Sequence, residues 1–162
     1  MHDERGFTLI ELLVVIAIMG ILASIIFNSI RKAREFALIG KAKAELEQIR
    51  RTVFMLEVDA NEWPGHKAVG TIEGGAGNNE IWDLTVPEAG LVATDGNFDG
   101  WKGPYITAPM KDPWGNHYFF DTDYDIDSSG AQKWAAVVGS FGPNGEGQNV
   151  YDSDDIIEIL AE

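Results

Sequence analysis

One apolar stretch near the amino terminus constrains this chain more than any other feature of its sequence. No residue from Leu12 to Phe27 is charged, and with residues 7–10 the stretch reaches the roughly 20 apolar residues that a membrane-spanning helix needs. Glu11 interrupts it. Because an ionised carboxylate inside a bilayer costs on the order of 3 kcal/mol, such a residue normally has a partner. We therefore expect a helix over residues 7–30 in a membrane or an apolar assembly, with a partner for Glu11.

Two common kinds of amino-terminal apolar segment fit this stretch poorly. A removable secretory signal has a basic start, a short apolar core and a small-residue cleavage site. Here residues 1–5 are of mixed charge, and the core runs directly into residues 24–28. A simple membrane anchor would explain the apolar run but would leave Glu11 unexplained.

A third interpretation comes from a resemblance. The segment Gly6-Phe7-Thr8-Leu9-Ile10-Glu11, followed by the apolar run, resembles the class III signal of type IV pilins and type II secretion pseudopilins. In that family a prepilin peptidase cuts after the glycine and methylates the new amino terminus. The resemblance thus implies a leader over residues 1–6 and processing at Gly6 and Phe7. It also implies an assembly role, in which the amine of Phe7 in one subunit neutralises Glu11 of its neighbour in the filament.

Length, charge and cysteine content exclude several classes of protein. The 162 residues suffice for one domain beside the anchor, and the absence of cysteine excludes disulfides and thiolate metal sites. Residues 59–162 hold 4 Lys or Arg against 19 Asp or Glu, a formal net charge of −15. Nucleic-acid binding by this part is not expected, because attraction to phosphate requires a basic face. A solvated acidic surface and divalent cation binding both remain open.

Helical periodicity continues beyond the apolar run. Apolar residues recur at spacings of three and four, as in a helix with one buried stripe, at Ala42, Leu46, Ile49, Val53 and Leu56. The segment Pro64-Gly65 strongly favours a turn. The sequence therefore predicts one helix from Phe7 to about Asp59. Residues 31–162 would comprise its second half and a globular head.

The head is expected to form a small antiparallel sheet, which makes the chain an α+β protein with a long amino-terminal helix packed on that sheet. Strands are predicted over 101–106, 111–120 and 134–140, and a short helix over 81–84. Alternating acidic residues over 121–127 predict the exposed face of a strand or hairpin arm. The segments Gly103-Pro104-Tyr105 and Asp112-Pro113-Trp114-Gly115-Asn116 resemble the major pseudopilin of type II secretion.

The tail over residues 140–156 resembles the calcium loop of major pseudopilins. Calcium takes six to eight oxygen ligands. The resemblance implies that these come from the Phe141 carbonyl, the Asn144 side chain and the carboxylates of Asp152, Asp154 and Asp155. Asn144 stands where that family prefers aspartate, which removes one negative charge. The alternative is a solvated acidic terminus.

A second acidic segment, residues 95–100, matches the first half of an EF-hand loop. Its twelfth position is Ile106 instead of the bidentate glutamate, so we interpret the segment as a turn.

No enzyme motif occurs: the three histidines are scattered and no serine has an evident base partner. The resemblance implies a structural subunit that polymerises into a helical filament, the pseudopilus of type II secretion. It implies other pilins or pseudopilins, a prepilin peptidase and the inner-membrane assembly machinery as partners. The alternatives are a type IV pilin for adhesion or motility, and a membrane-tethered calcium-binding domain that does not polymerise.

The implied location is a single span of the bacterial inner membrane with the head in the periplasm, and later a filament in the periplasm or at the cell surface. Arg31, Lys32 and Arg34 follow the span and, by the positive-inside rule, predict the opposite orientation. We follow the class III signal because it is the more specific of the two.

Overall fold

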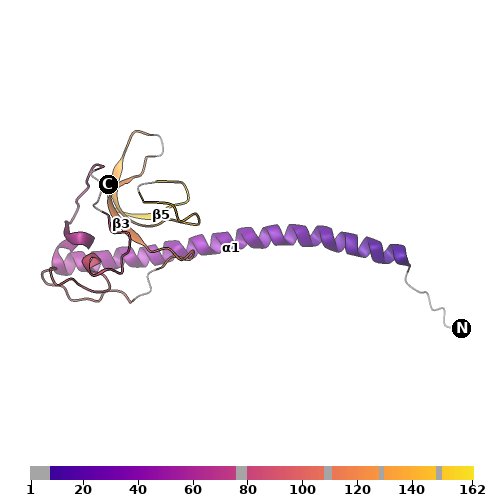
Figure 1. Cartoon of the computed structure of the whole chain (residues 1–162), viewed down its shortest axis with the longest axis horizontal. Coiled ribbons are helices and arrows are strands. Elements are labelled where there is room, and N and C mark those ends of the chain that lie inside the picture. The colour runs from indigo at the N-terminus through magenta and orange to yellow at the C-terminus, as the bar shows by residue number, and fades with distance from the viewer. Residues whose placement is uncertain (1–7, 76–79, 108–110, 128–129, 149–150) are drawn as a thin grey trace. The chain divides into compact units, whose positions relative to one another are not determined.

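The computed structural model describes residues 8–75, 80–107, 111–127, 130–148 and 151–162. It has the expected α+β architecture (Figure 1). Its elements are helix α1 (Leu9–Ala60), strand β1 (Glu62–Trp63), 3₁₀ helix η1 (Pro64–His66), strand β2 (Lys67–Ala68), 3₁₀ helix η2 (Pro87–Ala89), and strands β3 (Phe119–Asp125), β4 (Trp134–Ser140) and β5 (Ile156–Ala161). The chain divides into two compact units, Met1–Ala37 and Leu38–Glu162.

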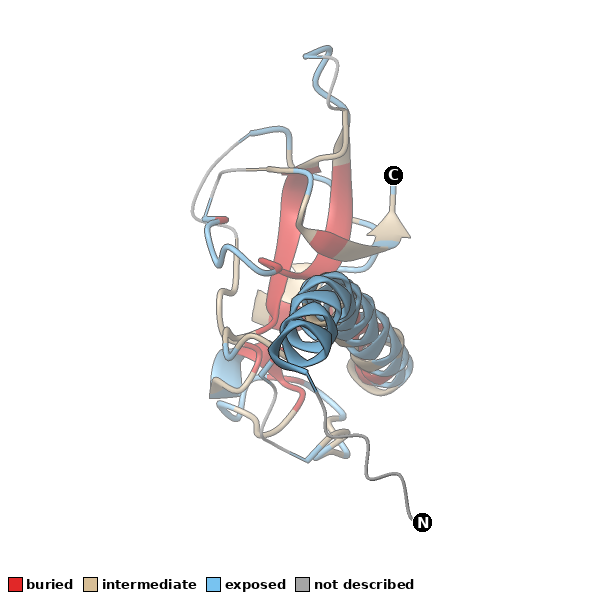
Figure 2. Cartoon of the chain, turned by 90° about the vertical axis from the view of Figure 1, so that its right-hand side faces the viewer, coloured by how far each residue is buried: buried red, intermediate tan, exposed pale blue. Residues whose placement is uncertain are grey.

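The first unit, in its described part, is the amino-terminal half of α1. Its large apolar side chains are exposed on all sides, and the turns of α1 nearest the viewer are coloured accordingly in Figure 2. By length and composition α1 is able to cross a membrane. The predicted helix over 7–30 is confirmed from Leu9 onward, and Phe7 lies outside the described residues.

The second unit has its main core on one stripe of α1. The five apolar residues of the predicted stripe are all buried and, together with Thr52, form the buried face of the helix. They pack against residues of the sheet that include Phe120, Val138 and Ile156. Burying one such aliphatic side chain contributes about 1.5–3 kcal/mol. The helix ends at Ala60, where Asn61 takes the left-handed conformation that asparagine tolerates.

In the three-stranded antiparallel sheet, strands β3 and β4 are buried on both faces, whereas most of β5 is only half-buried. Its order is β3-β4-β5, and Phe119 pairs with Gly139 while Phe120 pairs with Val138. Because side chains alternate along a strand, Phe120 faces α1 whereas Phe119 belongs to a second core on the opposite face. Loop residues, Trp82 and Phe141 among them, cover this second face, and the red strands of Figure 2 show the burial.

Polar contacts tie α1 to the head. The hydroxyl of Tyr118 donates to Glu45 at 2.6 Å. Asp59, near the end of the helix, accepts from Lys102 at 2.7 Å and from the hydroxyl of Tyr105 at 3.0 Å. These contacts fix the orientation of the helix against the loops more than they add stability, since exposed ion pairs contribute little.

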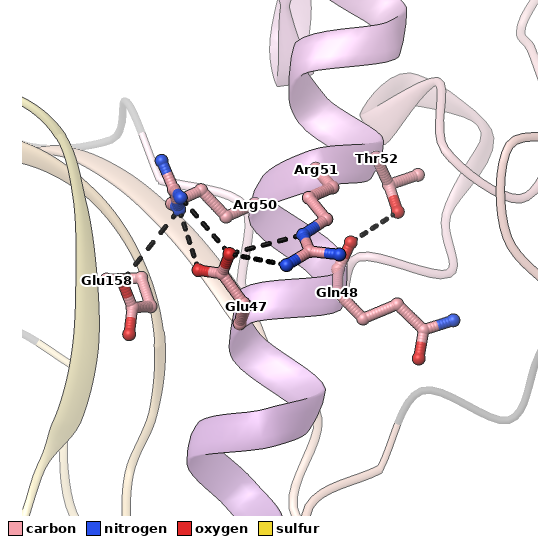
Figure 3. A network of polar contacts seen from close by, with 6 residues as sticks. All are labelled: Glu47, Gln48, Arg50, Arg51, Thr52 and Glu158. Carbon is pink, nitrogen blue, oxygen red and sulfur yellow. Dashed lines mark hydrogen bonds and ion pairs between the residues drawn. The ribbon is translucent and has the colours of Figure 1, made fainter.

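A helix-surface network reaches the third strand. Glu47 accepts hydrogen bonds from both Arg50 and Arg51, and Arg50 also lies 3.9 Å from the carboxylate of Glu158 in β5 (Figure 3). Arg50 therefore links α1 to the edge strand of the sheet.

Three of the predicted elements are wrong in whole or in part. Residues 101–106 form no strand, because they dock on another loop: the amides of Tyr105 and Ile106 donate to the Leu91 carbonyl. Residues 81–84 form no helix, since the backbone of Ile81 pairs with Phe120 at the edge of β3. Within the predicted strand 111–120, strand β3 begins only at Phe119, because Asp112 holds the preceding residues in a turn. Strand β4 is confirmed, and β5 was not predicted.

The prediction that residues 121–127 present an exposed acidic face is also wrong. Asp121 and Asp123 are buried, with side chains 0% and 2% exposed. A register shift between Asp121 and Tyr124 places these two residues opposite Val137 and Ala135, which belong to the second core. Burial there raises the pKa of Asp121 to about 8. The register shift interrupts the period-two alternation on which the prediction relied, and loops cover this face of the strand.

A substitution at Gly139 tests the packing of the second core. A Cβ atom at this position would lie 2.3 Å from the ring of Phe119, so we expect Gly139→Ala to lower the free energy of unfolding by about 1–3 kcal/mol. Gly40→Ala is the control, because nothing lies within 4 Å of its added Cβ and alanine favours a helix. All five tryptophans lie in the second unit, so urea unfolding in detergent followed by tryptophan fluorescence measures the effect. Equal stability of both variants would contradict this packing.

His66 makes the stability of the head depend on pH. It stacks on Phe98 and lies 2.8 Å from Glu62 and 3.0 Å from Asp95. Partial burial acts to lower the pKa of His66, but the hydrogen bonds to Glu62 and Asp95 outweigh burial and raise it. The stabilisation is then complete below the ordinary histidine pKa of about 6.5 and disappears as the pH rises through the higher folded value.

We expect the stability difference between the unmodified protein and His66→Gln to be larger at about pH 5.5 than at about pH 8.5, by less than about 1 kcal/mol because the ring is partly exposed. Asp95 keeps its charge over this range, since hydrogen bonds from the Asn97 amide and from His66 lower its pKa to about 2. Urea titrations at the two pH values measure the difference. A difference that is the same at both, or larger at high pH, would contradict the role of His66.

Candidate functional site

The residues predicted for processing and assembly lie at the start of α1. Gly6 and Phe7 are outside the described residues. The Glu11 carboxylate accepts from the Thr8 amide at 2.8 Å and from the Thr8 hydroxyl at 2.7 Å, and the Glu11 amide donates to the hydroxyl oxygen of Thr8 at 3.3 Å. This reciprocal arrangement is a capping box. It holds the Glu11 carboxylate at the amino-terminal end of the helix, beside the residue that follows Phe7.

The helix behind Glu11 has an apolar surface with no partner among the described residues. The exposed large apolar side chains of this half are Leu9, Ile10, Leu12, Leu13, Val14, Val15, Ile16, Ile18, Met19, Ile21, Leu22, Ile25, Ile26, Phe27, Ile30 and Phe36. A helix that is apolar all round belongs in a membrane or in the interior of an assembly. This surface is therefore an insertion or polymerisation surface.

Part of the predicted calcium set is brought together in the tail. The Asn144 amide nitrogen donates to Asp152 and to Asp154 at 2.7 Å each, and the Asn144 backbone amide donates to Asp154 at 3.1 Å. The hydrogen bond between the two aspartates raises the pKa of Asp154 and lowers that of Asp152. Two carboxylates thus converge on the nitrogen of the side chain that sequence reasoning placed among the ligands, whereas the oxygen of that side chain accepts from the Glu146 amide at 2.7 Å.

Asp155 and the ring of Phe141 contact residues of the second core instead of Asn144. The Tyr124 hydroxyl donates to one oxygen of Asp155 at 2.8 Å, and the other carboxylate oxygen is buried without a hydrogen-bond partner in the structure as described. Burial raises the pKa of Asp155 to about 6. The ring of Phe141 stacks on Phe119 with centroids 4.5 Å apart, which anchors the tail on the second core.

Gly142 is needed for the path of this loop. Its φ is +60°, and an added Cβ would lie 2.1 Å from the backbone carbonyl oxygen of Asp154. The two ends of the loop can approach this closely only because the residue has no side chain.

Asp112 positions the tail, a role that sequence reasoning did not assign. Its carboxylate accepts from the amides of Trp114 and Asn116 and from the Ser140 hydroxyl at 2.7 Å. The same hydroxyl accepts from the amide of Gly142 at 3.1 Å. Asp112 therefore connects its own Asp-Pro-Trp-Gly-Asn turn to the start of the tail. An aspartate before proline at a turn was the available signal.

A second acidic group was also missed. One oxygen of each of Glu80, Asp121 and Asp123 lies within 4.8 Å of those of the other two. Sequence reasoning treated the two aspartates as solvated and did not include Glu80. The EF-hand-like segment, by contrast, is the turn that was predicted, with Asp95 accepting from the Asn97 amide at 3.0 Å.

Oxygen ligands, which calcium requires, are the donors that the tail supplies. Asp152 and Asp154 converge there, and the buried oxygen of Asp155 has no hydrogen-bond partner in the described chain. The donor set therefore fits calcium chemically.

Comparison with known proteins identifies two matching families. Residues 1–27 match the prokaryotic N-terminal methylation motif, and residues 88–158 match type II secretion system (T2SS) protein G. The second match includes the Asp112 turn and the tail. No solved structure matches the chain.

Curated relatives agree with the second family. The chain is 31% identical to type II secretion system core protein G of Dickeya chrysanthemi over 95% of its own length and 84% of the relative's. It is 30% identical to the protein of the same name from Pectobacterium carotovorum over 89% and 79% of the two chains, and 31% identical to that of Vibrio cholerae over 73% and 70%. These matches favour a pseudopilin over a type IV pilin or a non-polymerising calcium-binding domain. The chain thus belongs to the family of type II secretion system core protein G, the major pseudopilins, which are structural subunits of the pseudopilus and not enzymes.

Proposed function

We propose that the chain is cut after Gly6, is methylated at Phe7 and polymerises through α1, in helical register, into the pseudopilus of a type II secretion system. The observation that carries this proposal is the apolar surface of the first half of α1, exposed on all sides, with a single carboxylate held at its amino-terminal end. The match of residues 1–27 to the methylation motif supports the processing step.

The chemistry of Glu11 explains why processing and assembly are coupled. Cutting after Gly6 creates a cationic amine at Phe7. In a filament the amine of one subunit pairs with Glu11 of its neighbour, which removes an unpaired charge from the apolar interior. The capping box presents Glu11 toward the end of the helix where such an amine would arrive. Side-by-side packing of α1 helices then buries their apolar surfaces.

The proposed setting follows from the same features. The span holds the subunit in the inner membrane before assembly, and the acidic head lies in the periplasm. A prepilin peptidase processes the subunit, and the inner-membrane assembly machinery adds it to a filament that contains other copies and minor pseudopilins. Arg31, Lys32 and Arg34 are exposed just beyond the span, where lipid head groups can neutralise them.

We also propose that calcium binds the tail. Asn144, Asp152, Asp154 and Asp155, with the Phe141 carbonyl, would hold the ion, and calcium would supply the positive charge that these carboxylates lack. Support comes from the convergence of Asp152 and Asp154 on Asn144 and from the unpaired oxygen of Asp155. Binding would stabilise the loop against the second core, where Phe141 and Tyr124 already connect it.

Glu11→Ala tests the assembly step. Leaving the Phe7 amine unpaired in an apolar interior costs about 3–5 kcal/mol, so we expect subunits that reach the membrane but form no filaments. Electron microscopy of sheared filaments measures assembly, and mass spectrometry of the membrane fraction shows whether residues 1–6 are removed. Glu35→Ala, at an exposed position later in α1, is the matched control and should assemble normally. Normal filaments from Glu11→Ala, or retention of residues 1–6 by the unmodified chain, would defeat the proposal.

The calcium proposal is tested by isothermal titration of the detergent-solubilised chain after removal of metals. We expect the double variant Asp154→Asn/Asp155→Asn to lose a calcium ion that the unmodified chain binds. Asn144→Asp restores a negative charge and should bind that ion more tightly, by roughly tenfold for about 1.4 kcal/mol. Glu88→Gln/Asp99→Asn removes the same charge at two exposed positions and should bind as the unmodified chain does. Equal binding by both double variants would exclude the tail site.

A further inference from the structure

We propose that Glu80, Asp121 and Asp123 form a second divalent-cation site, separate from the tail loop and suited to calcium. Glu80 belongs to the segment that connects the helical half of the head to the sheet, and the two aspartates lie in β3. The inference does not depend on the proposed function, because it uses other residues and another part of the fold.

Burial and missing hydrogen bonds point to a ligand. Asp121 and Asp123 are almost fully buried, at 0% and 2% exposure. Each has a buried oxygen without a hydrogen-bond partner in the described structure, and so does Glu80. The second oxygen of Asp121 accepts from the Asp123 amide at 2.7 Å, and the carboxyl groups of Asp121 and Asp123 lie close enough to share a proton. Buried polar groups are normally satisfied, so three unsatisfied carboxylate oxygens in one place require an explanation.

The absence of a neighbouring positive charge in the described part of the chain also points to a bound cation. Among the residues that the structure describes, no Lys, Arg or His forms an ion pair with any of these three carboxylates, although other acidic residues of the head do have such partners. A buried carboxylate without a compensating charge costs several kcal/mol. A divalent cation removes this cost for all three groups at once, whereas a shared proton compensates only one of them.

The number of carboxylates favours calcium over magnesium. One oxygen from each residue lies within 4.8 Å of the other two, so one ion can reach all three. Calcium accepts six to eight oxygens in a flexible geometry, whereas magnesium demands a near-ideal octahedron and is usually bound through only one or two carboxylates. Three carboxylates held partly by a buried strand therefore suit calcium better. Water and backbone carbonyls would complete the coordination.

An ion at this position would connect three parts of the second face of the sheet. Glu80 stands next to Ile81, whose backbone pairs with Phe120 at 2.8 Å and 2.9 Å. Asp121 borders the register shift in β3, and Asp123 lies within it. The Tyr151 hydroxyl donates to the Asp123 carbonyl at 3.3 Å, which brings the tail against the same strand. The ion would therefore hold the Glu80 segment on β3 and stabilise the surface on which the tail folds.

The test counts calcium ions bound to the full chain. Metal-stripped protein in detergent is titrated with CaCl₂ alone and with MgCl₂ alone, by calorimetry and by native mass spectrometry. Asp121→Asn/Asp123→Asn keeps the shape of both side chains, and we expect it to bind one calcium ion fewer than the unmodified chain. Asp154→Asn/Asp155→Asn should retain this ion, so loss of the tail site and loss of the second site are distinguished. Glu88→Gln/Asp99→Asn is the charge-matched control and should bind the full number.

Folding of the aspartate variant is controlled in two ways. Glu80→Gln changes a residue that is only half-buried, and we expect it to weaken binding at least tenfold while tryptophan fluorescence remains that of the folded head. Calcium should also raise the melting temperature of the tail variant but raise it less in a chain that carries Glu80→Gln as well. Equal calcium stoichiometry in the unmodified chain and Asp121→Asn/Asp123→Asn, or no binding by the tail variant, would overturn the proposal.

Discussion

Burial of strands β3 and β4 on both faces is the constraint on which the rest of the head depends. One face packs on the apolar stripe of α1 through residues such as Phe120 and Val138. The other has too few apolar residues on its own strands and is completed by loops that contribute Trp82, Phe141 and Tyr151. A small sheet covered on one side only would bury little apolar surface. The loops that cover the second face are therefore part of the structural core of the head.

This arrangement explains why acidic residues gather where they do. The loops that supply aromatic rings to the second core also bring Glu80 beside Asp121 and Asp123, and they bring Asp155 beside Tyr124. Ionised carboxylates, which the chain carries in excess, are well solvated at a surface, but their burial in a core costs free energy. The proposed cation binding would reconcile the two requirements. The tail and the Glu80 cluster would then be two solutions to one electrostatic problem on one face of the sheet.

The first half of α1 obeys a different constraint. Nothing among the described residues of the chain covers its apolar side chains, so its stable environment is lipid before assembly and other subunits afterwards. The capping box of Thr8 and Glu11 satisfies amides at the start of the helix and keeps the carboxylate at that end. One residue thus serves the helix of the single subunit and, as proposed, the contact between subunits.

The sequence by itself determined the features that depend on local chemistry and periodicity. Apolar spacing predicted α1 and its buried stripe, Pro64 and Gly65 marked its end, and the turn residues on either side predicted β4. It also placed Asn144 with Asp152 and Asp154, although only through resemblance. Tertiary structure decided the features that depend on long-range backbone pairing and on burial. Ile81 became an edge partner of β3 instead of a helix, and Asp121 and Asp123 were buried because loops distant in sequence cover their face. Alternation shows which residues share a face of a strand, but only the packed fold shows whether that face meets water.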